Sequence, residues 1–264
     1  GQDLVFSFWG AVLHGAIPAI MPFLSEKLSP ERYRADLASL ISITKPSAII
    51  TSAEFESEAH SALMPGDSIR KVMITNAIEA QAEPDFDSLP GMKAAPEDIV
   101  ILQHSSGTTG LQKGVALSHK AVLNQLEAYN KAIHIDNERD VIVSWLPLYH
   151  DMGLIACFLL PILLRVPVIE MSPFDWVRAP YKLLQSVSQY KGTLSWLPNF
   201  AYNFCANKIR ERNLEGVDLS TWRAIINCSE PVHVESHRLF AEKFEKFGLR
   251  PQILQTSYAM AENV

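Results

Sequence analysis

Cysteine is scarce in this sequence: the 264 residues include three, Cys157, Cys205 and Cys228. They are widely spaced and odd in number, and no Cys-x-x-Cys pair occurs. A disulfide framework and a zinc ribbon both need paired or closely spaced cysteines, so this pattern argues against both. We therefore expect a protein of a reducing compartment, the cytoplasm.

Long apolar runs and an excess of basic charge are also missing. The longest apolar run, Gly153–Leu164, contains Pro161 and is shorter than the roughly 20 residues of a membrane-spanning helix, so we expect buried core and no transmembrane segment. The apolar N-terminus has no basic residue before it, unlike a signal peptide. The chain has 23 Lys and Arg against 29 Asp and Glu, a net charge of −6. This balance argues against broad nucleic-acid binding but allows one phosphorylated small molecule.

What remains is the composition of a globular protein, with 48% hydrophobic and 20% charged residues. Short apolar runs alternate with amphipathic stretches, which is typical of an α/β fold with mostly parallel sheets and helices packed on both faces. We expect helices at 4–14, 30–44, 119–132, 181–190, 198–211 and 234–247, and strands at 17–22, 48–51, 71–75, 99–102, 114–117, 141–146, 222–227 and 252–256.

Residues 83–98 are the best candidate for a linker, because they contain three prolines and several acids and show no periodicity. The linker would separate a first α/β subdomain, residues 1–82, from a second one, residues 99–264. The first subdomain begins inside a helix, as expected of one truncated at its N-terminus. The second contains the motifs that carry chemistry.

The sharpest of these motifs is a loop between two expected strands, His104 to Gly114. It holds three glycines, four hydroxyl side chains and one lysine, Lys113. Glycines let backbone N–H groups approach phosphate oxygens, hydroxyls add donors and lysine adds a compact positive charge. The spacing is not G-x-x-x-x-G-K-[ST], since Gln112 occupies the position that pattern gives to its second glycine. The simpler interpretation is a flexible turn rich in Ser, Thr and Gly.

Order and spacing favour the phosphate loop. The stretch 102–115 resembles the T-S-G-[ST]-T-G-x-P-K-G loop of adenylate-forming enzymes, the superfamily of acyl-CoA synthetases, luciferases and peptide-synthetase adenylation domains. Further along, 144–154 (S-W-L-P-L-Y-H-D-M-G-L), 227–232 (N-C-S-E-P-V) and 257–262 (S-Y-A-M-A-E) resemble its aromatic-His, adenine-loop and Y-G-x-[AT]-E segments. The first of these three is most similar to the fatty-acyl-AMP ligase branch. The sequence departs from the family at Ser105, Gln112, Cys228, Ser229 and Ala259.

The resemblance implies a role for each matched residue. Lys113, Glu262 and His150 would be the catalytic residues, with Glu262 holding Mg²⁺ and His150 positioning the substrate at the mouth of the acyl tunnel. Tyr258 would stack on adenine against the backbone of Ser229, Glu230 and Pro231. The phosphates of ATP would be held by Ser105, Ser106, Gly107, Thr108, Thr109, Gly110 and Lys113.

Two histidine sites have a structural alternative. Within an apolar strand and loop, His150 on its own is more simply a structural histidine. His233 and His237 have the i, i+4 spacing of zinc ligands, but H-V-E-S-H lacks the H-E-x-x-H pattern and a third ligand. We interpret this pair as part of a helix surface.

The implied function is ATP-dependent activation of a medium- or long-chain fatty acid as acyl-AMP, with release of pyrophosphate, for transfer to the thiol of a carrier protein or of CoA. The resemblance also implies parts that would follow Val264, including a ribose-binding Asp and a C-terminal domain. We therefore expect an incomplete N-terminal domain that is inactive alone. An acyl-CoA synthetase fragment and a degenerate, non-catalytic module that binds nucleotide or acyl chains remain alternatives.

Overall fold

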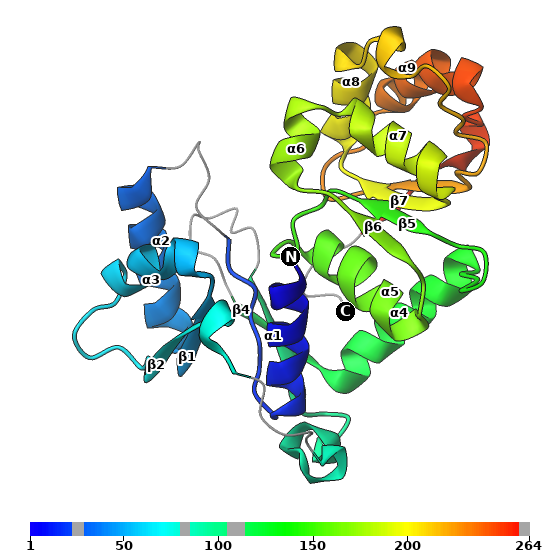
Figure 1. Cartoon of the computed structure of the whole chain (residues 1–264). Helices are drawn as coiled ribbons and strands as arrows, with labels where there is room; N and C mark the ends of the chain where they lie inside the picture. Colours follow the sequence, from blue (N-terminus) through cyan, green and yellow to red (C-terminus); the bar gives the residue numbers. More distant parts are fainter. Residues whose placement is uncertain (23–28, 80–84, 105–113, 259–264) are drawn as a thin grey trace. The chain divides into compact units, whose positions relative to one another are not determined.

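The computed structural model describes residues 1–22, 29–79, 85–104 and 114–258. The chain divides into two compact units, residues 1–120 and 121–264 (Figure 1). Within the described residues, no helix is long and apolar enough to cross a membrane.

The first unit contains two small sheets and three helices within its described residues. Strands β1 (Ala48–Thr51) and β2 (Lys71–Ile74) pair in parallel, and β3 (Ile99–His104) pairs antiparallel with β4 (Gly114–Ser118). The helices are α1 (Gln2–Leu13), α2 (Pro30–Thr44) and α3 (Glu56–Ser61). Helix α2 begins as expected, because the Ser29 side chain accepts a hydrogen bond from the Arg32 backbone N–H and Pro30 occupies the first turn.

The division between the units falls after Lys120 and differs from the boundary expected at 83–98. Two contacts tie residues beyond and within that segment to the N-terminal residues of the same unit. The Leu102 N–H donates to the Pro18 carbonyl at 3.1 Å. At Gly91, an added Cβ would lie 2.1 Å from the Val12 carbonyl oxygen, so only glycine permits this approach to α1.

The strand expected at 17–22 is wrong. Residues 16–22 form neither helix nor strand, although the Pro18 carbonyl accepts one bond from β3. Pro18 and Pro22 have no N–H to donate to a neighbouring strand, and this prevents a regular ladder.

The second unit is built on a five-stranded parallel sheet in the order β6-β5-β7-β8-β9. The strands are β5 (Ile142–Ser144), β6 (Val168–Glu170), β7 (Leu194–Leu197), β8 (Ala224–Asn227) and β9 (Leu254–Thr256). The helices are α4 (His119–Ile133), α5 (Leu160–Leu164), α6 (Pro173–Arg178), α7 (Tyr181–Tyr190), α8 (Asn199–Lys208) and α9 (Val234–Phe244). A π-helical segment, Gly153–Leu159, is continuous with α5 and fully buried, as expected for this apolar run.

Helices cover both faces of this sheet, which confirms the expected α/β class. Successive strand residues point to opposite faces. Trp196 on β7 contacts Tyr129 of α4, whereas the neighbouring Ser195 accepts a hydrogen bond from Trp222, which packs on Phe240 of α9. Figure 1 accordingly shows α4 and α5 on one side of the sheet and α7, α8 and α9 on the other.

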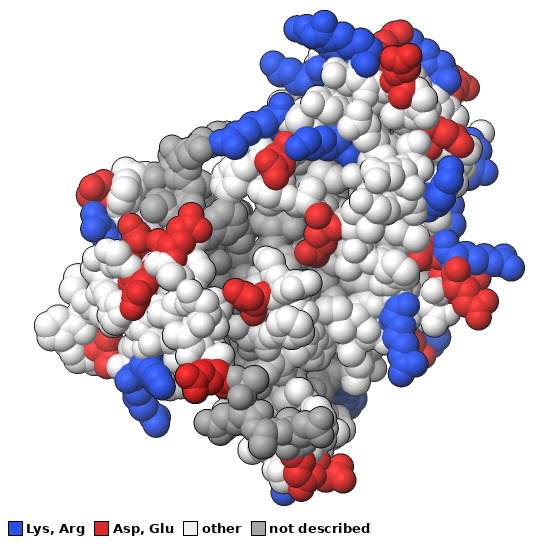
Figure 2. All heavy atoms as spheres, viewed as in Figure 1, with Lys and Arg blue, Asp and Glu red and all other residues white. Residues whose placement is uncertain are grey.

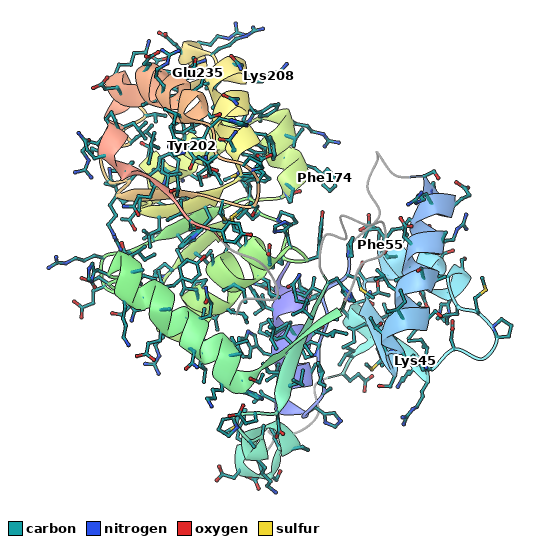
Figure 3. All side chains as sticks on the ribbon, turned by 180° about the vertical axis from the view of Figure 1, so that it is seen from behind. Lys45, Phe55, Phe174, Tyr202, Lys208 and Glu235 are labelled. Carbon is teal, nitrogen blue, oxygen red and sulfur yellow. The ribbon has the colours of Figure 1, made fainter. Side chains whose placement is uncertain are left out.

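Large aromatic side chains fill the core of the second unit. Trp176, Trp196, Trp222, Phe240 and Phe244 are all fully buried. Tyr202 of α8 points into the same interior, while Lys208 and Glu235 lie at its outer surface (Figure 3). The loops at the ends of the strands are therefore attached to a well-packed core.

Candidate functional site

Three of the segments expected to carry chemistry lie at one edge of the five-stranded sheet, together with the residues that follow β7. Residues 145–152 follow β5, residues 198–199 follow β7, residues 228–231 follow β8 and residues 257–258 follow β9. All five strands are parallel, so these are their carboxyl ends. Ligands of open α/β sheets bind in the crevice beyond this edge. The sheet therefore collects His150, Ser229, Glu230, Pro231 and Tyr258 along one edge.

A carboxylate that sequence analysis did not select holds His150. The His150 Nδ1 lies 2.6 Å from the Asp151 Oδ1, which also accepts the Met152 backbone N–H at 2.7 Å. Burial acts to raise the pKa of Asp151, but the hydrogen bond and charge of His150 outweigh it, and the net pKa is lowered. The imidazole keeps 39% of its side chain exposed. His150 is thus fixed by an ionised neighbour and still accessible to a ligand.

The turn that carries His150 depends on Gly153. An added Cβ there would lie 2.3 Å from the Pro147 carbonyl oxygen, a contact that no side chain can make. The His150 N–H also donates to that carbonyl at 3.1 Å. The sequence places its glycine where this tight turn meets the buried π-helical segment.

Asn227, the last residue of β8, is the centre of a buried polar network. Its amide nitrogen donates to the Asn199 Oδ1 at 3.2 Å and lies 2.9 Å from the His237 Nε2. Asn199 also accepts the His233 backbone N–H at 3.0 Å. These contacts use both amide protons of Asn227, and its Oδ1 is left buried without a donor among the described residues.

His237 is therefore more than the helix-surface residue we expected. Its ring is half-buried and packs on Tyr202, with ring centroids 4.8 Å apart. Burial lowers its pKa, which keeps the imidazole neutral and able to accept the Asn227 proton. Polar residues directly after apolar strands, Asn227 and Asn199, were the signal that could have indicated this network.

The 228–231 loop links the ends of three strands. Cys228 and Ser229 both contact the Met152 sulfur, which belongs to the segment after β5. Glu230 accepts the Phe200 backbone N–H, from the start of α8, at 2.5 Å. Ser229 has φ of +78°, a left-handed conformation that costs a residue other than glycine about 1–2 kcal/mol. Strain of this kind clusters at functional sites.

Tyr258 presents an open aromatic surface after β9. Its side chain is 83% exposed, while the preceding residue is held by a hydrogen bond of 3.0 Å from the Ser257 N–H to the Asn227 carbonyl. An exposed ring on an anchored backbone suits stacking on a planar ligand.

The remaining expected site residues lie outside the described part of the chain. Among them are Lys113 and Glu262, together with Ser105, Ser106, Gly107, Thr108, Thr109 and Gly110. The strands that border the expected phosphate loop pair with each other, with His104 opposite Gly114.

The chain matches the AMP-binding enzyme family over residues 3–264. A medium-chain-fatty-acid–[acyl-carrier-protein] ligase of Teredinibacter turnerae is 32% identical over 207 residues, which cover 78% of this chain and 32% of that protein. A putative fatty-acid–CoA ligase of Mycobacterium tuberculosis is 30% identical over 268 residues, which cover 98% of this chain and 45% of that protein.

Solved structures of ligases are also similar to this chain. The crystal structure of a fatty acyl-adenylate ligase from L. pneumophila, in complex with acyl adenylate and pyrophosphate, has a TM-score of 0.85 and 33% identity. The match covers 99% of this chain and 44% of that one. This chain thus spans less than half the length of the relatives described here. Because the family match runs over almost every residue, the chain belongs to the family of AMP-binding enzymes.

Proposed function

We propose that the protein activates a medium- or long-chain fatty acid as acyl-AMP and passes the acyl group to a thiol. The observation that carries the proposal is the convergence of three motif segments at the carboxyl edge of the parallel sheet. The 33% identity to a ligase solved with acyl adenylate and pyrophosphate supports it. Here the full-length protein means this chain together with whatever sequence its gene adds on either side.

The reaction brings two anions together, so binding and charge neutralisation account for most of the catalysis. In the first step a carboxylate oxygen attacks the α-phosphorus of ATP, the bond to the bridging oxygen breaks and pyrophosphate leaves. In the second step a thiol sulfur attacks the acyl carbon, the thiol loses its proton and AMP leaves. The carboxylic acid is already ionised near pH 7 and needs no base in the first step.

In this proposal Lys113 and the residues from Ser105 to Gly110 hold the phosphates, and Tyr258 stacks on adenine beside Ser229, Glu230 and Pro231. His150, fixed by Asp151, positions the fatty acid. Glu262 supplies a carboxylate oxygen, a donor that suits Mg²⁺. In this proposal Glu262 and the phosphates of ATP would together hold the ion.

A fatty acid fits α8 better than an amino acid does. A site for an amino acid needs a carboxylate to pair with the α-ammonium group, and α8 contains no acid from Asn199 to Lys208. The helix instead contributes Phe200, which contacts the stacked rings of Trp145 and Trp176.

The experiment that tests the proposal is ATP–pyrophosphate exchange by the full-length protein with acids from acetate to dodecanoate and with free amino acids. Each buried CH₂ contributes about 0.8 kcal/mol, so exchange should rise steeply with chain length. Equal activity from acetate to dodecanoate, or a preference for an amino acid, would refute the fatty-acid assignment. Absence of exchange with every acid would favour the non-catalytic alternative.

A second prediction concerns Lys113. Replacing it with alanine in the full-length protein should weaken the use of MgATP roughly ten- to a hundredfold, because a charge-assisted contact to phosphate is worth about 1.5–3 kcal/mol. The affinity for the fatty acid should change much less. An unchanged KM for ATP combined with a raised KM for the acid would contradict the assignment.

The acceptor is the remaining choice within this proposal. The two relatives named above differ on it, since one is named as a carrier-protein ligase and the other as a CoA ligase. We propose the carrier protein. Supplying the adenylating protein with either acceptor and measuring AMP release decides between them.

A further inference from the structure

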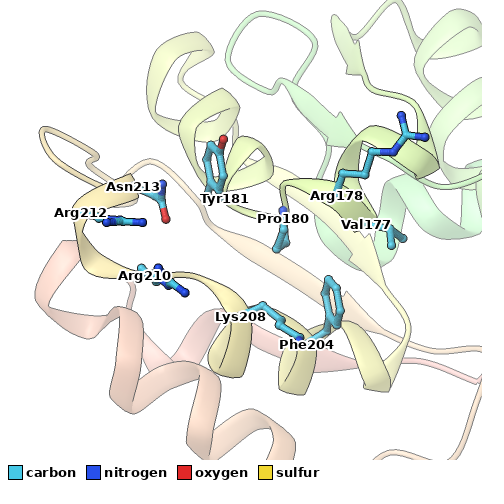
Figure 4. Close-up of a pocket in the computed structure, with 9 residues that line it drawn as sticks. All are labelled: Val177, Arg178, Pro180, Tyr181, Phe204, Lys208, Arg210, Arg212 and Asn213. Carbon is cyan, nitrogen blue, oxygen red and sulfur yellow. The ribbon is translucent and has the colours of Figure 1, made fainter.

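A cavity of about 490 Å³ opens on the outer side of the second unit, at the far end of α8 from the candidate site (Figure 4). Its apolar wall includes Val177 and Phe204. Four cationic side chains line it as well, from the ends of α6 and α8 and from the segment after α8: Arg178, Lys208, Arg210 and Arg212.

The positive charge around this cavity contrasts with the net charge of the whole chain, which is −6. Among the residues that the structure describes, no Asp or Glu lines the cavity. The acid nearest in sequence, Glu211, is paired with Lys246 instead. Among the described residues, Lys208, Arg210 and Arg212 have no carboxylate partner, and all three are exposed. Figure 2 shows lysine and arginine side chains gathered over this end of the second unit.

The arrangement fits a protein surface better than a free phosphate. A phosphate site gathers convergent donors, commonly the backbone N–H groups of a loop or a helix N-terminus. Here Lys208 is at the C-terminal end of α8, and the cationic groups surround an apolar wall (Figure 4). Protein interfaces have this anatomy, with an apolar centre that takes an anchoring side chain and a charged rim that steers the partner.

We propose that this cavity docks the carrier protein that accepts the acyl group, an inference that rests on the proposed function. An acidic segment of the carrier would place carboxylates opposite Lys208, Arg210 and Arg212 and one apolar side chain between Val177 and Phe204. Helix α8 runs from Asn199, at the carboxyl edge of the sheet, to Lys208 at the cavity. Its ten residues span about 15 Å, a separation that a thiol on an extended arm of the carrier can cross.

The test is the full-length protein with Lys208→Glu, Arg210→Glu and Arg212→Glu combined. Three readouts separate docking from chemistry: ATP–pyrophosphate exchange, acyl transfer to a thiol-loaded acyl carrier protein, and acyl transfer to free pantetheine. Exchange and transfer to pantetheine should stay within twofold of the wild type. The KM for the carrier protein should rise at least tenfold, and the variant should lose the rise in KM that salt produces in the wild type.

A charge-matched control reverses three exposed cations elsewhere in the second unit, Arg139, Arg165 and Lys191. It should leave the KM for the carrier protein within threefold of the wild type. An equal rise in both variants, or no rise in the cavity variant, would overturn the proposal. A loss of exchange in the folded cavity variant would overturn it as well, because it would place these residues in the adenylation site.

Direct binding keeps the inference separable from the proposed function. Calorimetric titration of the thiol-loaded carrier protein into the wild type and both variants needs no turnover. If the wild type shows no exchange with any acid, the proposed function fails, and the titration still decides whether the cavity binds the carrier. If the glutamate variant does not fold, the corresponding glutamine variant gives the same comparison, with at least a fivefold loss of affinity expected. Unchanged affinity in the glutamine variant would overturn the proposal.

Discussion

The two edges of the five-stranded sheet differ in how their polar residues are satisfied. The amino edge is the one at which the strands begin, and the carboxyl edge is the one at which they end. At the amino edge, polar side chains satisfy one another and tie the strands together. At the carboxyl edge, the described residues leave the buried Asn227 Oδ1 without a donor, Ser229 adopts a positive φ within a loop, and Tyr258 is largely exposed.

The amino edge is held together by three polar residues that lie just before strands. Asp140 precedes β5, Thr193 precedes β7 and Arg223 precedes β8. Arg223 binds both carboxylate oxygens of Asp140, at 2.7 and 2.6 Å, and donates to the Ile133 and His134 carbonyls. The Thr193 hydroxyl donates to the same carboxylate at 2.7 Å. Every acceptor of the buried carboxylate has a donor, so this edge is a structural joint.

The difference between the two edges indicates which edge of the sheet carries the functional site. Stable folding favours satisfied groups and relaxed backbone, and departures from that rule are frequent at functional sites. The Asn227 Oδ1 and the Ser229 backbone are such departures, and both lie at the carboxyl edge. Mutations at the two edges should therefore separate stability from activity.

The largest effect should come from breaking the amino edge with Asp140→Ala. The Asp140 side chain is 2% exposed, and removing it leaves the Arg223 guanidinium without its partner. The free energy of unfolding should fall by about 3 kcal/mol, with the KM for ATP unchanged in the folded variant. Urea unfolding measures the first quantity and exchange kinetics the second. The control Arg139→Ala, at an exposed pair with Asp136, should cost less than about 0.5 kcal/mol.

The same residue gives a pH dependence. Burial alone would raise the pKa of Asp140, but the hydrogen bonds from Arg223, Asp136 and Thr193 lower it below its ordinary value. The stabilisation is therefore complete above the unfolded pKa of about 3.9 and is lost as the pH falls through the lower folded value. The Asp140→Ala variant should lack this acid-sensitive component, and an identical pH profile would contradict the assignment.

An intermediate effect is expected from His237→Ala at the carboxyl edge. The variant loses an acceptor for the buried Asn227 amide, which should cost about 1–2 kcal/mol and raise the KM for ATP by loosening the 228–231 loop. Burial lowers the pKa of His237, so its contribution is present above the unfolded pKa of about 6.5 and is lost as the pH falls. Unfolding at pH 5 and pH 8 should show a smaller pH difference in the variant than in the wild type.

The smallest effect, of opposite sign, is expected from Ser229→Gly. Glycine adopts a positive φ without strain, so the variant should be more stable by about 1 kcal/mol, while the KM for ATP rises because the loop is less constrained. Lys191→Gly is the matched control, since Lys191 has φ of +56° at the end of α7. It should stabilise by a similar amount and leave the KM for ATP unchanged. If both variants behave alike in kinetics, the strain at Ser229 has no functional part.

Local patterns predicted much of the fold. The helix at 181–190 has the expected ends, and α2 begins at its expected Ser-Pro cap. Two strands of the second sheet, β6 (Val168–Glu170) and β7 (Leu194–Leu197), were missed. They have three and four residues, too few to show a period, and only burial between neighbouring strands and helices makes them strands.

The motifs selected His150, Ser229 and Tyr258, which lie at the carboxyl edge of the sheet and whose roles stay predictions. Asp151 was not selected, and His237 was interpreted as part of a helix surface. Asp151 contacts its sequence neighbour His150, whereas His237 reaches Asn227 from a helix ten residues further along the chain. The second contact depends on how α9 packs against the end of β8, which no local pattern encodes.

The contacts among Asp140, Thr193 and Arg223, the joint at the amino edge, also have a consequence for the rates of folding and unfolding. Asp140 and Arg223 are 83 residues apart in the chain, so their pairing closes a long loop whose entropy must be lost before the contact forms. We expect such contacts to form late in folding, and contacts that are absent from the folding transition state slow unfolding more than they accelerate folding. The joint should therefore govern how long the second unit persists once folded, more than how quickly it is made.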